Sequence, residues 1–251
     1  MLIAGLDLAA EPKATALAVL NWPSQSHEMV TLVSLEVGVD DKRILDQVAR
    51  FEKLGIDCAL GWPVEFVDFL KSFGSADLGD RVFAGDIDWR RRLAYRETDR
   101  EVRRITGRWP LSVSTDRLGM TALRCAGLLT KLQGAGIAVD RSGLGKVVEI
   151  YPAASMRIWG FDTAGYRNSA GIRQQLIHQL KAEAEWLNLG GFEKLMTESC
   201  DAFDAVIAAL AAASARLGRS TRAPADKVQL AKIEGWISLP TSKLENLALD
   251  D

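Results

Sequence analysis

Four carboxylates stand in apolar segments, where soluble proteins usually avoid charge. Asp7 and Glu149 each lie inside an apolar run that is typical of a buried strand. Asp201 and Asp204 are spaced i, i+3 at the start of an alanine-rich helical segment, so both lie on one helix face. A buried charge is costly unless it is paired or bound to a metal, so we expect these acids to converge. Asp7, Glu149 and Asp204 are the predicted metal ligands, and Asp201 joins them as a candidate catalytic residue.

Each of these acids also has a structural interpretation. Asp7 would end its strand and bond to the turn that follows, and Glu149 would form an ion pair with an arginine from the insertion at about 65–113. Asp201 would be the N-cap of its helix. Capping explains Asp204 less well, because a run of small apolar residues follows it directly.

The chemistry that such a carboxylate cluster favours is phosphodiester hydrolysis. Carboxylate oxygens suit Mg²⁺ or Mn²⁺, and a pair of such ions about 3.5–4 Å apart activates water and stabilises the leaving oxygen. We therefore predict a divalent-metal-dependent nuclease. Only two histidines occur, His27 and His178, which argues against a histidine zinc site and against a Ser-His-Asp triad.

A second group of residues predicts contact with nucleic acid. Residues 81–108 hold nine arginines and five acids, a local charge of +4 in a chain whose net charge is −2. Arginine forks suit phosphate oxygens and aromatic rings stack on bases. The predicted nucleic-acid-binding residues are Arg96, Arg100, Arg103, Trp89 and Tyr95. The alternative is a solvated helix face on which neighbouring acids pair with the arginines.

The elements that must position these residues follow from hydrophobic spacing. Residues 2–8, 14–20 and 29–37 predict three antiparallel strands. A helix over 41–54 leads to a parallel strand at 57–62, and a further strand covers 146–152. Helices are predicted over 116–133, 170–188 and 201–216, the last lying very close to the sheet because it is rich in alanine. This order predicts an α/β, ribonuclease H-like fold: a mixed five-stranded sheet with helices on both faces.

Length and composition fit one such domain. The 251 residues, 48% hydrophobic and 25% charged, predict a single domain over 1–251 with an arginine-rich insertion at about 65–113. The slightly acidic charge excludes a protein that coats nucleic acid through bulk charge. Three distant cysteines predict free thiols in a cytoplasmic protein, and neither a signal peptide nor an 18-residue apolar run is found. The glycines at 134–145 precede a strand, which disfavours a dinucleotide-binding loop.

Several motifs together resemble a known family. They are GLDLA at 5–9, LGWP at 60–63, YRETDREVR at 95–103, VVEIYP at 147–152, YR at 166–167, DAFDAVIAAL at 201–210 and EGWISLP at 234–240. The chain resembles the predicted ribonuclease H-like nuclease family known as domain of unknown function 429. The resemblance implies a fold in which Asp7, Glu149 and Asp204, together with Asp201, hold the metal. The i, i+3 acids also look like those of Holliday-junction resolvases, which share that fold.

One departure from the family pattern bears on activity. Where the family has an acid on the fourth strand, this sequence reads Leu60-Gly61-Trp62-Pro63, and Gly61 has no side chain to bind a metal. Asp7 and Glu149 would then start about 10 Å apart, two strand spacings, and Glu65 is the candidate substitute. The alternative function is a non-catalytic module that binds nucleic acid or a protein. A nucleotide-binding relative of sugar kinases is disfavoured, because that fold needs two such domains.

Overall fold

A mixed β-sheet forms the centre of the molecule. The computed structural model describes residues 1–23, 28–74 and 83–248, so His27 and Arg81 lie outside it. In this part of the chain the sheet has six strands in the order β5-β4-β1-β2-β3-β6. The strands are β1 Leu2–Asp7, β2 Ala16–Asn21, β3 Val30–Val37, β4 Lys53–Asp57, β5 Val147–Glu149 and β6 Leu187–Asn188. β1, β2 and β3 are antiparallel, whereas β4 and β5 run parallel to β1, which confirms the predicted mixed α/β sheet.

The sixth strand was not expected. β6 pairs in parallel with β3 through two residues, Val30 with Leu187 and Thr31 with Asn188. A two-residue strand has no alternation that a sequence pattern can reveal. The sheet therefore has one more strand than predicted, at the β3 edge.

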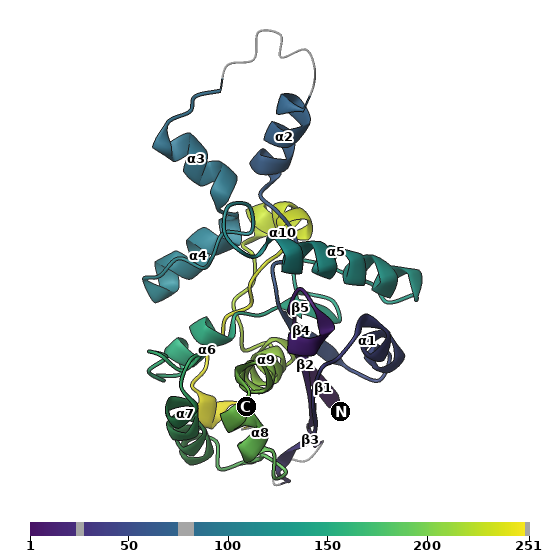
Figure 1. The fold of residues 1–251 in the computed structure, drawn as a ribbon, viewed down its shortest axis with the longest axis vertical. Helices are drawn as coiled ribbons and strands as arrows, with labels where there is room; N and C mark the ends of the chain where they lie inside the picture. Colours follow the sequence, from purple (N-terminus) through teal and green to yellow (C-terminus); the bar gives the residue numbers. More distant parts are fainter. Residues whose placement is uncertain (24–27, 75–82, 249–251) are drawn as a thin grey trace.

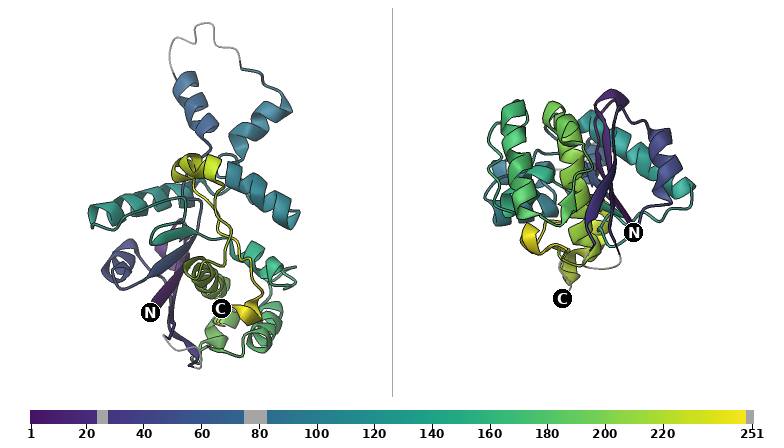
Figure 2. Two further views of the ribbon diagram at one scale, coloured as in Figure 1. Left: turned by 180° about the vertical axis from the view of Figure 1, so that it is seen from behind. Right: turned by 90° about the horizontal axis from the view of Figure 1, so that it is seen from below.

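Helices cover both faces of this sheet (Figure 1). The helices are α1 Asp41–Val48, α2 Val64–Phe73, α3 Ile87–Ala94, α4 Glu97–Thr106, α5 Gly119–Gly134, α6 Pro152–Ile158, α7 Ala170–Glu183, α8 Glu193–Glu198, α9 Cys200–Arg216 and α10 Val228–Glu234. α9, backed by α6, α7 and α8, packs on one face, and α1 and α5 pack on the other (Figure 2). Within the described ranges, no helix is both long enough and apolar enough to cross a bilayer.

The fourth strand lies earlier in the chain than predicted. The helix predicted over 41–54 ends at Val48, and β4 is Lys53–Asp57 rather than 57–62. Phe51 and Leu54 continue the helical spacing, but they reach the same core from a turn and from the strand. A longer helix and the observed turn followed by a strand would both bury these two side chains, so their spacing does not distinguish the two possibilities. Gly55, which directly follows the predicted helix over 41–54, lies in the middle of β4.

Two glycines let α9 pack directly on the sheet. Gly5 and Gly55 are register partners on β1 and β4. A Cβ on Gly5 would lie 2.1 Å from the Ala209 nitrogen, and a Cβ on Gly55 would lie 2.9 Å from the Ala208 oxygen. Side chains at these positions would therefore push α9 away. The predicted close approach of the alanine-rich helix is confirmed.

The residues between β4 and α5 project from the body. α2 and α3 rise away from the sheet, while α4 lies at their base beside α10 (Figure 1). Glu234, at the end of α10, accepts hydrogen bonds from the backbone N–H of Val64 at 2.8 Å and of Glu97 at 3.0 Å. One carboxylate therefore caps the N-termini of both α2 and α4. α2 and α3 contact each other through rings that include Phe69 and Trp89, 5.5 Å apart.

Candidate functional site

Two aspartates end adjacent strands on the same face of the sheet. Asp7 of β1 and Asp57 of β4 are register partners in the parallel pair. Each aspartate lies two residues after a glycine that α9 covers. Because side chains alternate between the two faces of a strand, both aspartate side chains point towards α9. The fourth strand therefore does carry an acid, and the expectation that Gly61 leaves this strand without one is wrong. The missed signal is a repeated Gly-apolar-Asp pattern, GLD at 5–7 and GID at 55–57.

Helix α9 brings a third carboxylate to this pair. Asp204 is 3% exposed and accepts hydrogen bonds from the Tyr166 hydroxyl at 3.0 and 3.1 Å. Asp201 lies one turn earlier on the same face and is partly buried. It is not the N-cap, because Ser199 fills that place and accepts a hydrogen bond from the Ala202 N–H at 3.1 Å. Both acids are therefore available for a role other than capping.

The electrostatics show how closely the acids are grouped. Burial, followed by repulsion from Asp57, Asp204 and Asp201, raises the pKa of Asp7 well above its usual value. Burial and the Asp204 charge raise the pKa of Asp57 to about 8. Burial also raises the pKa of Asp204 to about 6, although Arg167 and the Tyr166 hydroxyl act against it. Each carboxylate thus disfavours the ionised form of a neighbour, as expected when like charges share a site.

Asp7 and Asp57 are also short of partners. In the described part of the chain, neither carboxylate has a hydrogen bond or a close ion pair. Both line a cleft of about 660 Å³, together with Asp201 and Asp204. Partly buried carboxylates without donors are unfavourable unless something outside the chain neutralises them.

Glu149 lines the same cleft and its charge raises the pKa of Asp57, but its side chain does not join the aspartates. Glu149 is the register partner of Ile56. Val147, two residues earlier on the same face, packs in the core under α1 and α5. The Glu149 side chain therefore leaves the sheet on the face opposite to Asp7 and Asp57. Both of its oxygens accept hydrogen bonds from Arg96, at 2.7 and 2.9 Å. The Leu60 N–H donates a third hydrogen bond at 3.0 Å. Glu149 therefore has the arginine partner that its alternative interpretation described.

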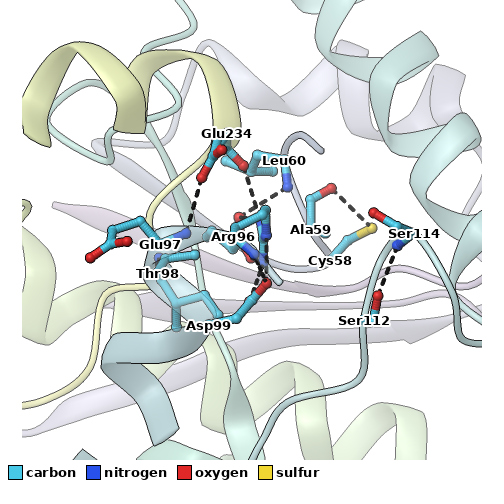
Figure 3. Close-up of polar contacts among 12 residues, drawn as sticks. Cys58, Ala59, Leu60, Arg96, Glu97, Thr98, Asp99, Ser112, Ser114 and Glu234 are labelled. Atoms are coloured by element: carbon cyan, nitrogen blue, oxygen red, sulfur yellow. Dashed lines mark hydrogen bonds and ion pairs between the residues drawn. The ribbon is translucent and has the colours of Figure 1, made fainter. Parts of the chain in front are cut away.

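Arg96 connects this ion pair to the projecting helices. Its guanidinium also donates to Asp99, at 2.9 and 3.2 Å, and to the Glu234 carbonyl at 3.1 Å. Figure 3 shows Arg96 lying between Asp99, Leu60 and Glu234. Burial raises the pKa of Glu149, while the charge and hydrogen bonds of Arg96 lower it. This side-chain network fixes the cleft wall and leaves Arg96 no free edge for a ligand.

The predicted nucleic-acid residues are mostly engaged with the protein itself. Arg100 pairs with Glu97 at 3.2 Å, Tyr95 stacks on Trp109 with ring centroids 4.1 Å apart, and Trp89 packs on Phe69. Arg103 is exposed on α4. Arg91, Arg92 and Arg104 pair with Asp88, Glu65 and Glu101, so acids neutralise much of this segment, as the alternative interpretation expects. Glu65 is therefore occupied away from the acid cluster.

A different set of arginines lines the cleft. They are Arg108, Arg117, Arg157 and Arg167, from the segment before α5, from α6 and from the residues before α7. Arg157 is notable because its Nε and Nη2 are buried without a hydrogen-bond partner among the described residues. These two atoms form one edge of the guanidinium, the edge that Arg43 uses to bind Glu36. An oxoanion with two oxygens satisfies such an edge.

The donor set suits a hard cation, although the side chains do not converge on one point. No group of three or more His, Cys, Asp or Glu side chains in the residues with described positions is arranged to hold a metal ion. Asp7, Asp57 and Asp204 offer only oxygen donors, which Mg²⁺ and Mn²⁺ prefer. The site therefore fits a divalent cation by its chemistry and its surplus of negative charge.

Two other predictions concern neighbouring segments. Cys58, Cys125 and Cys200 are free, as predicted. The glycine-rich segment before β5 turns a backbone carbonyl towards Lys53. The Lys53 ammonium donates to the Gly143 oxygen at 2.7 Å. That this segment is not a dinucleotide-binding loop stays a prediction.

Comparison with known proteins identifies a family but no described relative. The model of the family described as "Protein of unknown function (DUF429)" matches residues 5–229. No curated protein and no solved structure matches the chain.

Proposed function

The chain belongs to the DUF429 family of proteins of unknown function, and we propose that it is a divalent-metal-dependent nuclease with Asp7, Asp57 and Asp204 as the metal-binding carboxylates. The observation that carries the proposal is the in-register pair Asp7 and Asp57, which faces α9 and has no partner in the described chain. Asp57 takes the place that the sequence assigned to Glu149. Asp201 remains a candidate fourth acid.

The topology supports the same proposal. Three antiparallel strands followed by two parallel strands, in the order β5-β4-β1-β2-β3, support the ribonuclease H-like arrangement that the sequence predicts. Asp7 and Asp57 end two adjacent strands and Asp204 comes from a later helix, so acids from the sheet and from α9 line one cleft. A fold alone does not define an activity, so the proposal depends on the site.

The residues divide the chemistry between them. A divalent cation bound here would supply Lewis-acid chemistry for the hydrolysis of a phosphodiester. Asp7 and Asp57 would hold it from the sheet and Asp204 from α9, while the Tyr166 hydroxyl orients Asp204. The cleft arginines neutralise and position the phosphate backbone, and Arg157 offers two parallel donors to one phosphate.

A cleavage assay tests the proposal. Labelled DNA and RNA, single- and double-stranded, are incubated with protein and Mg²⁺, Mn²⁺ or EDTA. We expect cleavage that needs a divalent cation and falls by at least about 100-fold in Asp57→Asn, as for other lost charge-stabilising groups. Asp68→Asn is the control, because Asp68 is exposed on α2 and, among the described residues, pairs with Lys71 alone.

The outcomes distinguish the nuclease from the binding module. Cleavage that persists in EDTA, or that Asp57→Asn leaves intact, overturns the metal-dependent mechanism. Salt-sensitive binding without turnover under either cation favours the non-catalytic module instead. That alternative depended on Gly61, and Asp57 now supplies the acid that Gly61 lacks.

A further inference from the structure

Arg167 is the one basic side chain that acts on all four aspartates of the cleft in the described part of the chain. It lowers the pKa of Asp7, Asp57, Asp201 and Asp204. Arg173 also acts on Asp201, but its guanidinium donates to the carbonyls of Tyr166 and Thr197, so it is fixed elsewhere. Arg167 therefore performs part of the neutralisation that a bound cation would perform.

The contacts of Arg167 are weak enough to be exchanged. Its Nη2 lies 3.7 Å from an Asp204 oxygen, beyond hydrogen-bond distance, and its side chain is 48% exposed. Among the described residues its side chain makes one hydrogen bond, from Nε to the Tyr166 hydroxyl at 3.2 Å, and its guanidinium lies 5.8 Å from the centroid of the Tyr166 ring. Arg96 offers the contrast: it is 3% exposed and donates two hydrogen bonds to Glu149. Moving Arg96 would leave a buried charge without its partner, whereas Arg167 already lines the cleft in a half-exposed position and can move at a lower cost.

We propose that Arg167 is a built-in counter-ion of the acid cluster that a divalent cation displaces when it binds. This inference rests on the proposed metal site and adds how its occupancy is controlled. A cation among the acids repels the guanidinium, because both positive charges compete for the Asp204 oxygen. The displaced side chain stays attached next to Tyr166 at the cleft wall, where it meets the phosphates of a nucleic acid. Metal binding and substrate binding then become coupled through one side chain.

Calorimetric titration with Mn²⁺ tests this competition without any turnover. We expect Arg167→Gln to bind Mn²⁺ about tenfold more tightly than the wild type, since one positive charge about 4 Å from a ligand is removed. Arg167→Lys keeps a charge and should stay near the wild-type affinity. Arg117→Gln is the matched control, because Arg117 also lines the cleft but affects the pKa of none of the four acids.

Each result of this titration has one meaning. Unchanged or weaker Mn²⁺ binding by Arg167→Gln overturns the counter-ion role, and so does an equal gain in Arg117→Gln. If neither the wild type nor Arg167→Gln binds Mn²⁺, the proposed metal site itself fails. The melting temperature gives a second readout: metal-free Arg167→Gln should melt below the wild type and should gain more from added Mn²⁺. An unchanged melting temperature without metal contradicts the inference.

Discussion

Asp57 and Glu149 show how differently two acids on neighbouring strands can be placed. Asp57 faces α9, lacks a partner in the described chain and has its pKa raised to about 8. Glu149 leaves the sheet on the other side and is held by Arg96 and by the Leu60 N–H. The charge of Asp57 therefore destabilises the folded protein, whereas Glu149 is needed to balance a buried guanidinium.

These two placements predict opposite effects on stability. In metal-free protein at pH 8.5, Asp57→Asn should raise the free energy of unfolding by about 1 kcal/mol or more, since one unit of pKa shift corresponds to about 1.4 kcal/mol. Glu149→Gln should lower it by about 3 kcal/mol, because Arg96 then lacks one of its buried partners. Urea denaturation measures both. Shifts of the same sign in the two variants would contradict this assignment.

At the residue scale, the sequence revealed the acids that have unusual neighbours. Asp7 and Asp204 stand out because apolar residues surround them, and the structure places both in one cleft. Asp57 was missed because the strand was assigned to residues 57–62, which makes Asp57 its first residue, whereas Asp57 is the last residue of β4. The sequence offered an arginine of the insertion as a partner for Glu149 but did not indicate which one, since Arg96 lies 53 residues away in the chain.

At the scale of elements, the close packing of α9 on β1 and β4 determines where the acids meet. Gly5 and Gly55 remove the side chains that would separate the helix from the sheet, and the aspartates follow two residues later on the same face. The glycines therefore contribute to the site without any chemistry of their own. A helix held further from the sheet would carry Asp204 away from Asp7 and Asp57.

This packing predicts a strong effect from a single methyl group. Gly55→Ala places a Cβ 2.8 Å from Ile150 and 2.9 Å from the Ala208 oxygen, so we expect a loss of about 3 kcal/mol in the free energy of unfolding. Gly127→Ala is the control, because it lies inside α5 with nothing within 4 Å of the added Cβ. It should gain about 0.5–1 kcal/mol from helix propensity. Thermal melts of both variants test the pair, and a neutral Gly55→Ala would argue against the close approach.

Element prediction succeeded where a segment has one clear period. The strands β1, β2 and β3 and the helices α5, α7 and α9 overlap their predicted ranges. α6 and α8 are short, with seven and six residues, and give little periodic signal. The segment at 41–57 failed for a different reason, because its apolar spacing satisfies a helix and a turn followed by a strand equally well.

At the scale of the whole molecule, charge is distributed unevenly despite a net charge of only −2. The arginine-rich helices neutralise themselves with their own acids, as Arg96, Arg100 and Arg104 show. The carboxyls whose ionisation is not compensated are instead Asp7 and Asp57 in the cleft, where burial and like charges raise their pKa values. Global charge therefore says little about the site, and no count of charged residues predicts where the surplus lies.

The unevenness predicts a pH dependence of stability. The pKa of Asp57 is raised to about 8 in the folded protein, so between about pH 4 and pH 8 the folded state binds more protons than the unfolded state. Stability of the metal-free protein should therefore fall as pH rises through this window. Melting curves from pH 5 to pH 8 measure the fall, and Asp57→Asn should flatten it. A rise in melting temperature over the same range would contradict the raised pKa.

The contact that Glu234 makes has a practical consequence for anyone who shortens this chain. The family match ends at residue 229, yet Glu234 holds the first residues of both α2 and α4. Ile237 and Ser238 then run beside Glu149, and the Ser238 N–H donates to the Glu149 carbonyl at 2.9 Å. A recombinant fragment trimmed to the matched region would lose the hydrogen bonds of Glu234 and Ser238 and expose Arg96. The smallest useful fragment must therefore keep the backbone contacts that residues 237–240 make with the body, and it extends at least to residue 240.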